Sequence, residues 1–353
     1  MLLLIDDKIP FMRGQAERLG RAVYLPGAEI TPADVREADA LIVRTRTKID
    51  KRLLDGSRVR FVATATIGTD HIDTAYLDSR GIGWASAPGC NAGSVAQYVA
   101  CTLAVLWQEG VLTMKPEQCA VGVIGVGHVG KRVCEAVERM GCRVLRCDPP
   151  RAEEEGAAGF ATLEEVLAEA DVVTLHVPLT SAGRYATFHM ADAPFFEALK
   201  KKSVFINAAR GEVADTDALI SAIDAGKVSA AVIDTWEHEP HISPELLRRA
   251  RIATPHIAGY SADGKACGTR MALEAVARAL GRDDLRFDDI LPPPLPEGFV
   301  YSPEDFKNVQ QLPNPWRELL RLYDPRRDSR ALKACPDEFE KLRGDYPLRR
   351  EVF

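Results

Sequence analysis

Three side chains in the second half of the chain have the types that an acid–base oxidation of an alcohol requires. Arg210 lies in NAARGEVAD, Glu239 in DTWEHEP and His256 in TPHIAGY. An imidazole can remove a hydroxyl proton, and a carboxylate can orient that imidazole and stabilise its protonated form. A guanidinium can bind a substrate carboxylate through a planar pair of hydrogen bonds. Together they predict a site that oxidises a 2-hydroxy acid, with His256 as the base.

Each of these residues also has a structural explanation when it is taken alone. An Arg-Gly pair after a strand is often a turn, and a Glu-Pro pair is often a surface turn. A histidine between Pro255 and Ile257 can be a hydrogen-bonded core residue. The catalytic interpretation therefore depends on finding all three on one nucleotide-binding fold.

The most specific local motif is the glycine-rich segment 125–130, GVGHVG, which follows the apolar run VGVIG and opens a helical pattern. Its three glycines permit a tight turn, close approach of the backbone to a pyrophosphate, and close packing of helix on strand. The N-terminus of the following helix favours an anion. The segment predicts a dinucleotide site, and a glycine-rich turn without a nucleotide is the alternative.

An acidic residue follows the next predicted strand. Asp148 lies 18 positions after Gly130, where a carboxylate can accept hydrogen bonds from the adenosine ribose hydroxyls. It would repel a 2′-phosphate, which favours NAD over NADP. Arg151 lies close by in the sequence and keeps NADP open as an alternative.

Short apolar runs alternate with amphipathic segments along most of the chain. The predicted strands are 2–5, 40–43, 60–65, 121–125, 143–147, 171–177, 203–207 and 230–234. The predicted helices are 91–109, opened by Asn91 as N-cap, and 127–140, 162–169, 215–225 and 261–280. The later strands are continuously apolar, as expected for parallel strands covered on both faces. The pattern predicts a doubly wound α/β fold, with helix 91–109 connecting two α/β domains.

The composition changes after residue 280. The window LPPPLPEG at 291–298 holds four prolines, which predicts a linker rather than a helix or central strand. Residues 299–353 mix charged residues with scattered large apolar ones. A segment of this size forms only a small core, so we expect it to pack on another part of the protein.

Composition excludes several classes of protein. The 353 residues suggest two or three domains, and 45 basic against 51 acidic residues give a net charge of -6. That charge argues against a sequence-independent nucleic-acid partner. No apolar run reaches the ~18 residues of a membrane span, and Asp6 and Asp7 interrupt the apolar start too early for a signal peptide. The eight cysteines form no C-x-x-C pair, so we expect reduced thiols, no metal site and a cytoplasmic protein.

Taken in chain order, these motifs resemble the D-isomer-specific 2-hydroxyacid dehydrogenases. Further segments narrow the resemblance to a subgroup acting on 4-phospho-D-erythronate, over nearly the whole chain: 42–50, 63–73, 86–99, 147–151, 255–269, 322–328 and 339–351. The resemblance implies two doubly wound Rossmann-like domains and a small C-terminal α+β dimerisation domain. The implied boundaries are 1–90 and 256–280 for substrate binding, 91–255 for NAD binding, 281–298 for the linker and 299–353 for dimerisation.

The resemblance also implies roles for individual residues. Catalysis falls to Arg210, Glu239 and His256. The cofactor contacts, including the glycine motif, are Gly125, Gly127, His128, Val129, Gly130, Asp148, Val177, Ala208, Ala209, Arg210, Asp234 and Gly259. The implied substrate contacts are Thr45, Thr66 and Tyr260. The chain departs from the family pattern at Thr45, where serine is expected, at Val177, which replaces a hydroxyl residue, and at the bulkier Ile67.

A basic segment follows the predicted strand 40–43. Arg44, Arg46 and Lys48 alternate with Thr45 and Thr47, so in an extended chain the three basic side chains would share one side. We expect at least one of Arg44 and Arg46 to contact the substrate's terminal phosphate. A solvated basic edge is the alternative.

The implied activity is NAD-dependent oxidation of 4-phospho-D-erythronate at C2 to (R)-3-hydroxy-2-oxo-4-phosphobutanoate. The resemblance places it in pyridoxal 5′-phosphate (vitamin B6) biosynthesis and implies a cytoplasmic homodimer without a nucleic-acid or membrane partner. One alternative keeps the chemistry on another D-2-hydroxy acid, such as 3-phosphoglycerate. Another is an NAD-sensing binding protein on a dehydrogenase fold.

Overall fold

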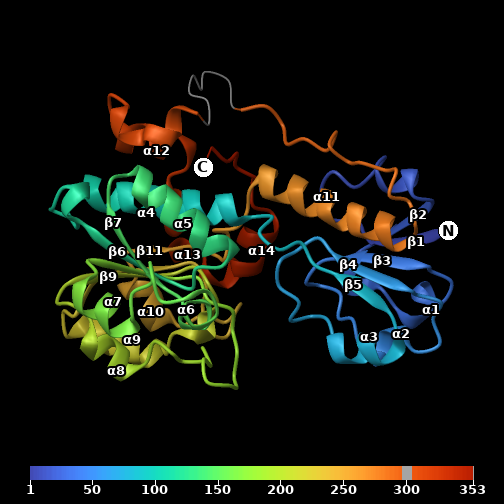
Figure 1. The fold of residues 1–353 in the computed structure, drawn as a ribbon, viewed down its shortest axis with the longest axis horizontal. Coiled ribbons are helices and arrows are strands. Elements are labelled where there is room, and N and C mark those ends of the chain that lie inside the picture. The colour runs from blue at the N-terminus through green and yellow to red at the C-terminus, as the bar shows by residue number, and fades with distance from the viewer. Residues whose placement is uncertain (296–303, 353) are drawn as a thin grey trace. The chain divides into compact units, whose positions relative to one another are not determined.

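The computed structural model describes residues 1–295 and 304–352, which divide into two compact units (Figure 1). The first unit consists of residues 1–91 and 261–295, and the second of residues 92–260 and 304–352. Each unit has its own parallel sheet. In the described parts of the chain, no helix combines the length and the apolar character that a membrane crossing would require.

The first unit is built on a five-stranded parallel sheet in the order β2-β1-β3-β4-β5. Its strands are β1 (Leu2–Asp6), β2 (Arg21–Leu25), β3 (Ala40–Val43), β4 (Phe61–Thr64) and β5 (Gly83–Ala85). Apolar residues fill both faces. Helix α11 (Ala262–Ala279) packs on one face, and α1 (Pro32–Val35), α2 (Lys51–Leu54) and α3 (Thr74–Arg80) pack on the other. This two-sided burial explains why 2–5 and 40–43 are apolar at every position.

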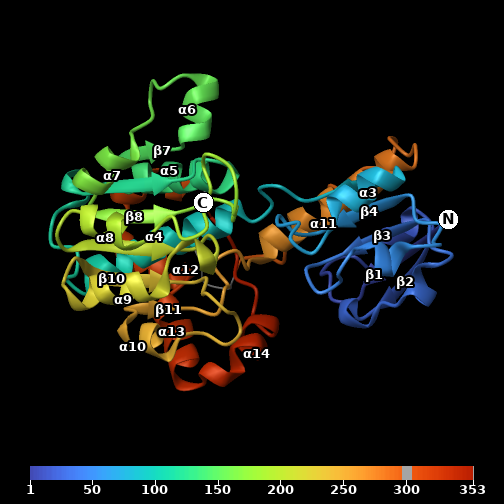
Figure 2. The same ribbon diagram turned by 90° about the horizontal axis from the view of Figure 1, so that it is seen from below.

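The second unit contains a six-stranded parallel sheet in the order β11-β10-β9-β8-β6-β7. The strands are β6 (Ala120–Ile124), β7 (Arg143–Cys147), β8 (Val172–Leu175), β9 (Ser203–Asn207), β10 (Val228–Ile233) and β11 (Ile252–Ala253). Figure 1 shows α4 (Ala92–Gln108) and α5 (His128–Arg139) on one face of this sheet. The other face carries α7 (Leu163–Glu169), α8 (Ala193–Ala198), α9 (Thr216–Asp224) and α10 (Pro244–Arg249). Figure 2 shows α6 (Pro149–Glu155) beyond the edge strand β7.

The predicted doubly wound α/β fold is confirmed, and all eight predicted strands form. Three strands escaped prediction, because β2 is a half-buried edge strand and β5 and β11 are only three and two residues long. The expected N-cap of α4 is not observed, since the Asn91 side-chain oxygen is buried without a hydrogen-bond partner among the described residues. That helix is instead stabilised by burial of nearly its whole length.

The boundaries of the units differ from those implied by the resemblance. Residues 256–260 stay with the second unit, rather than starting the return segment, because their backbone is bonded to Asp234. The described part of the expected linker packs on the first unit, where Phe287 and Ile290 enter the core.

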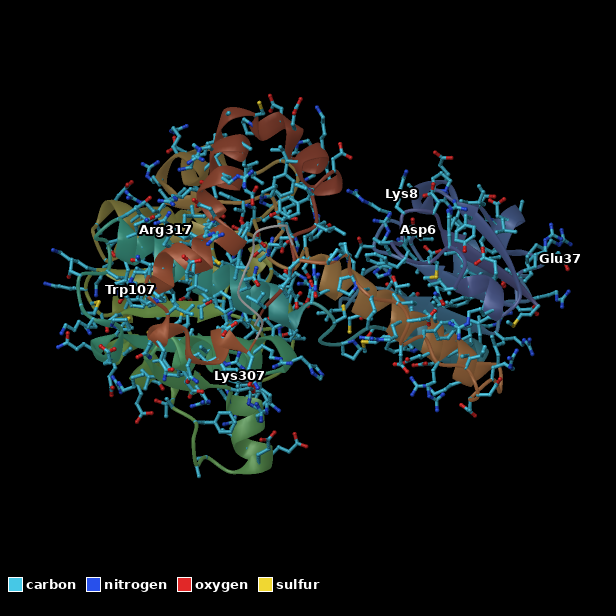
Figure 3. The ribbon with its side chains drawn as sticks, turned by 90° about the horizontal axis from the view of Figure 1, so that it is seen from above. Asp6, Lys8, Glu37, Trp107, Lys307 and Arg317 are labelled. Carbon is cyan, nitrogen blue, oxygen red and sulfur yellow. The ribbon has the colours of Figure 1, made fainter. Side chains whose placement is uncertain are left out.

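The C-terminal segment is part of the second unit rather than a separate domain. It forms η5 (Asp305–Gln311), α12 (Pro315–Leu322), α13 (Pro325–Ala334), η6 (Pro336–Glu338) and α14 (Phe339–Gly344). Its described residues contain helices and no strand, in contrast to the expected α+β character. Trp316 stacks on Trp107 of α4 with ring centroids 5.0 Å apart, and Figure 3 labels Trp107 together with Arg317 of α12. As expected from its small core, the segment depends on a larger neighbour.

Candidate active site

The residues predicted to bind the cofactor and to catalyse lie at one edge of the second sheet. Each group follows the carboxyl end of a strand: the glycine loop follows β6, Asp148 follows β7, Val177 lies just beyond β8, Ala208 to Arg210 follow β9, Asp234 and Glu239 follow β10, and His256 and Gly259 follow β11. All six strands are parallel, so these ends meet at the same edge, where ligands of open α/β sheets bind.

The glycine loop has the geometry that a dinucleotide needs. Gly125 has a φ of +87°, and a Cβ on Gly130 would lie 1.9 Å from the Gly125 carbonyl oxygen, so neither position accepts a side chain. A Cβ on Gly127 would meet nothing within 4 Å. The loop is therefore closed where helix and strand pack and open beside the N-terminus of α5, which suits a pyrophosphate.

Asp148 connects this loop to the end of β7. Its carboxylate accepts hydrogen bonds from the Val126 amide at 2.8 Å and from the Arg151 amide at 3.2 Å. The Arg151 guanidinium donates to Glu155 at 2.7 Å and also to the Val126 carbonyl. Glu155 thus balances the charge of Arg151, so this arginine gives little support for binding of a 2′-phosphate.

Glu239 and His256 form a hydrogen-bonded pair. The His256 Nδ1 lies 2.8 Å from Glu239 Oε2, and Glu239 Oε1 accepts from the Trp236 amide at 2.9 Å. Burial alone would raise the pKa of Glu239, but the hydrogen bond from His256 and nearby positive charges give a net lowering. The carboxylate therefore stays ionised and favours the tautomer with the proton on Nδ1, which leaves Nε2 to accept a proton.

The loop that carries His256 is fixed by Asp234. His256 has a φ of +56°, a left-handed conformation that is uncommon outside glycine. The Asp234 carboxylate accepts hydrogen bonds from the amides of Ile257 at 2.8 Å and Ala258 at 3.0 Å, and from the Thr254 hydroxyl at 2.6 Å. Burial raises the pKa of Asp234. These contacts stabilise the unusual backbone at His256.

Arg210 lies in a turn that packs on the turn carrying Glu239. The Asn207 side chain accepts from the Ala209 amide at 3.1 Å and donates to the Arg210 carbonyl at 3.0 Å. A Cβ on Gly211 would lie 1.9 Å from the Trp236 carbonyl carbon. Only glycine permits this approach, so the Arg210 turn and the Glu239 turn are in direct contact.

The substrate residues implied by the resemblance are divided between the units. Tyr260 belongs to the second unit, where its ring packs edge-on against Tyr346 with centroids 6.2 Å apart. In the first unit, the Thr66 hydroxyl lies 2.7 Å from the Thr64 hydroxyl. Thr45 and Arg46 are both exposed in the segment after β3.

The predicted cationic face of Arg44, Arg46 and Lys48 is wrong as stated. The chain turns after Val43, with the Thr47 amide bonded to the Arg44 carbonyl, so alternate residues do not share one side. Arg44 instead donates two hydrogen bonds of 3.0 Å to Asp6, whose side chain is fully buried. Figure 3 labels Asp6 and the adjacent Lys8 on the first unit.

Sequence reasoning missed several polar residues around these sites. Asp6 carried a signal, since it ends β1 on the same edge as the residues that follow β3 and β4. A second imidazole–carboxylate pair joins His189 to Glu237 at 2.6 Å. Arg343 and Arg349 of the C-terminal segment also approach the catalytic loops. No local pattern marks these last residues, because their contacts are long-range.

The chain is similar to known proteins over almost its whole length. Residues 95–258 match the D-isomer specific 2-hydroxyacid dehydrogenase, NAD binding domain. The chain is 49% identical over 352 residues to the erythronate-4-phosphate dehydrogenase of Bacteroides fragilis (strain YCH46), covering 99% of this chain and 97% of that protein. It is 40% identical over 356 residues to the same enzyme of Escherichia coli (strain SMS-3-5 / SECEC), covering 99% and 92%. A D-lactate dehydrogenase from Aquifex aeolicus, solved with NAD and lactic acid, is 26% identical with a TM-score of 0.65, covering 80% of this chain and 97% of that chain.

Proposed function

The chain belongs to the D-isomer-specific 2-hydroxyacid dehydrogenase family, and from that premise we propose the reaction it catalyses. It is an NAD-dependent dehydrogenase that oxidises 4-phospho-D-erythronate at C2 to (R)-3-hydroxy-2-oxo-4-phosphobutanoate, a step toward pyridoxal 5′-phosphate. The observation that carries the chemistry is the 2.8 Å contact between His256 and Glu239 at the nucleotide-binding edge of the second sheet. The relatives named erythronate-4-phosphate dehydrogenase support the substrate.

In this proposal His256 is the base. Its Nε2 takes the proton of the C2 hydroxyl, and the ionised Glu239 stabilises the imidazolium that results. Arg210 binds the substrate carboxylate and the oxygen that becomes the carbonyl. Asp234 keeps His256 in place through the amides of Ile257 and Ala258.

The second unit supplies the residues that would hold NAD. The open backbone at Gly127 and the N-terminus of α5 fit a pyrophosphate, and Asp148 would accept from the adenosine ribose. Val177 would contact the cofactor only through its backbone and apolar surface. When bound, NAD supplies the acceptor for the hydride that leaves C2.

The first unit supplies the residues that would hold the rest of the substrate, and we assign the phosphate to Arg46 rather than Arg44. Arg44 is only partly exposed and binds the buried carboxylate of Asp6, and Arg46 lies on the surface of the same turn, where its side chain is accessible to a ligand. Thr45 and Thr66 would donate hydroxyl hydrogen bonds to the same anionic ligand. Tyr260 of the second unit would contact the substrate as well.

The decisive experiment measures NADH formation from 4-phospho-D-erythronate, 3-phosphoglycerate and unphosphorylated D-erythronate under identical conditions. We expect the highest kcat/KM for 4-phospho-D-erythronate. A higher value for either competitor would reassign the substrate within the family. Intact NAD binding without turnover of any 2-hydroxy acid would favour the NAD-sensing alternative.

We also propose that the enzyme works in the cytoplasm as a homodimer, as the resemblance implies. All eight cysteines are free thiols, which suits a reducing compartment. Light scattering of the purified protein measures the mass of the assembly, and a mass near 39 kDa would contradict the dimer because one chain weighs 38.7 kDa.

A further inference from the structure

The C-terminal segment contacts the loop that carries His256, next to the contacts that Asp234 makes with the same residues. Arg349 donates hydrogen bonds to the Ile257 carbonyl at 3.1 Å and to the Ala258 carbonyl at 2.5 Å. The amides of the same two residues donate to Asp234. The backbone directly after His256 is therefore bonded both to a carboxylate and to a guanidinium.

The site that holds Arg349 is built for a guanidinium. Arg349 is buried, with 8% of its surface exposed, and its charged carbon lies 4.2 Å from the Tyr323 ring centre. It also donates to the hydroxyls of Ser94 and Tyr346 at 3.1 Å each, and the Tyr346 hydroxyl donates to Asp328 at 3.1 Å. Burying a charge requires such compensation. The planar fork matches two adjacent carbonyls, a geometry that lysine does not reproduce.

Helix α4 fixes the residues that follow Arg349. The buried Gln97 side chain donates to the Arg350 carbonyl at 3.0 Å and accepts from the Val352 amide at 3.0 Å. This reciprocal pair satisfies both ends of the amide and leaves the chain little freedom to shift. Arg349 is thereby held at a defined distance from the catalytic loop.

A second arginine of the segment approaches the partner of His256. Arg343, in α14, lies with its Nη1 3.5 Å from Glu239 Oε2, the oxygen that pairs with His256 at 2.8 Å. Arg343 lowers the pKa of Glu239, although burial acts in the opposite direction and the hydrogen bond from His256 contributes more. A fixed cation on that oxygen competes with the imidazolium that forms during oxidation. Asp234 adds a further negative charge near His256.

We propose that Arg349 and Arg343 are positioning residues for the His256–Glu239 pair, so that the C-terminal segment completes the active site of its own chain. Arg349 fixes the direction in which His256 Nε2 points. Arg343 shares the Glu239 carboxylate with His256 and so favours the neutral imidazole that accepts the substrate proton. The inference rests on the dehydrogenase activity proposed above, and it gives the segment a second role beside the expected dimerisation.

Arg343 is tested with Arg343→Gln, Arg343→Lys and the control Arg330→Gln, an exposed arginine on α13. We expect Arg343→Gln to lower kcat about tenfold at neutral pH and to move the acidic limb of kcat/KM to higher pH. Arg343→Lys restores most of the activity because it keeps the charge, and Arg330→Gln behaves as wild type. An unchanged pH profile would overturn the role of Arg343, as would a rise in substrate KM without a fall in kcat.

Arg349 is tested with Arg349→Lys and Arg349→Met, compared at a temperature where circular dichroism shows both to be folded. A displaced imidazole should lower kcat about a hundredfold, with the Kd of NADH, measured by fluorescence, within a factor of about two of wild type. Full kcat in the folded Arg349→Lys protein would overturn the role of Arg349. If neither variant folds, Gln97→Met is used instead, because it releases the backbone next to Arg349. The role of Arg349 then requires that Gln97→Met lowers kcat while NADH binding stays intact, and an unchanged kcat would overturn it.

A titration of the His256 ring by NMR separates this inference from the proposed function, because it needs no substrate. The resonance is assigned by its absence in His256→Gln. In Arg343→Gln its midpoint should move to higher pH, and in Arg330→Gln it should not move. A moved midpoint together with no turnover of 4-phospho-D-erythronate by the wild type would reject the substrate and keep the positioning role. An unmoved midpoint in an enzyme that turns over 4-phospho-D-erythronate would keep the substrate and reject the positioning role of Arg343.

Discussion

The two parallel sheets of this protein differ at the carboxyl end of one interior strand, β6 in the second unit and β1 in the first. In the second unit β6 runs into a glycine loop that stays open beside the N-terminus of α5. In the first unit β1 ends at Asp6, whose buried carboxylate binds Arg44, and a Cβ on Gly27 would lie 2.4 Å from it. The loop after β6 leaves open space beside its backbone at Gly127, and the end of β1 is filled by the protein's own ion pair.

The parallel α/β pattern by itself therefore does not make a nucleotide site. Both sheets are parallel, with apolar strands covered on two faces. The distinction depends on a few residues at the strand ends. Substitutions at those residues should therefore affect the two units in different ways.

The strongest loss of activity is expected from a substitution in the second unit. Replacement of His256 by Gln should lower kcat by about 10³-fold, because glutamine cannot act as the base that we propose for the hydroxyl proton. NADH binding, measured by fluorescence, should stay close to wild type, since in the proposed mechanism the imidazole acts on the substrate alone. Substantial residual turnover at neutral pH would show that another residue is the base.

The glycine loop offers a matched pair of substitutions. Gly127→Ala places a methyl in open space, so the fold should persist while a bound pyrophosphate is hindered, and NAD affinity should fall about 10- to 100-fold. Gly130→Ala forces a methyl against the Gly125 carbonyl and should also lower the melting temperature. Calorimetry together with an NADH titration distinguishes the two. Equal melting temperatures for both variants would contradict the packing role of Gly130.

The filled strand end of the first unit should respond through stability. Asp6→Asn leaves Arg44 without its partner and should lower the free energy of unfolding by about 2–3 kcal/mol. The double variant Asp6→Asn/Arg44→Met should recover part of that loss, since the unpaired cation is then absent. Denaturant unfolding measures both. A single variant as stable as wild type would mean that the pair contributes nothing.

A smaller effect should distinguish Arg46 from its neighbours. Arg46→Ala should raise KM for 4-phospho-D-erythronate about tenfold through loss of a charge-assisted hydrogen bond. It should leave KM for an unphosphorylated 2-hydroxy acid nearly unchanged. Lys48→Ala is the matched control, because that side chain is 83% exposed and lies 3.7 Å from Asp50. Equal effects on both substrates would assign the phosphate to other residues.

The smallest effect concerns the pH dependence of stability in the second unit. Burial raises the pKa of Glu239, but the hydrogen bond with His256, together with the other contacts of the carboxylate, gives a net lowering on folding. Glu239 therefore contributes stability above its unfolded pKa, about 4.5, and this stability disappears as the pH falls through the folded value. Burial raises the pKa of Asp234, so that group opposes folding as the pH rises. Unfolding curves of Glu239→Gln and Asp234→Asn should thus diverge from wild type with opposite slopes.

Much of the second unit was predictable from the sequence because its signals are local. The glycine motif, the acid after the next strand, and the Arg, Glu and His that follow successive strands each depend on neighbours in the chain. Topology alone then places them at one edge. The long apolar strands were also predicted from their sequences. The strand β2 is too exposed, and β11 is too short, to give such a pattern.

The features that escaped prediction depend on distant partners. Arg44 looked like a ligand for phosphate because its partner Asp6 is 38 positions away. Arg349 reaches a loop 92 positions earlier in the chain. The chain after β3 was also expected to be extended. It turns at Arg44 instead, so the side chains of alternate residues are not aligned as they would be in a strand. Charge and spacing indicate what a residue can bind, and only the tertiary fold decides what it does bind.

The absence of a side chain at Gly211 has a consequence for motion. With the backbones of Gly211 and Trp236 in contact, the turn of Arg210 and the turn of Glu239 cannot be displaced independently. We expect the two turns to move together, and the Glu239 carboxylate on one of them also contacts His256. A displacement of the Arg210 turn should therefore also shift Glu239 and its hydrogen bond to His256. In the proposed mechanism, the position of Arg210, which would bind the substrate carboxylate, is thus coupled to the position of His256, which would remove the proton.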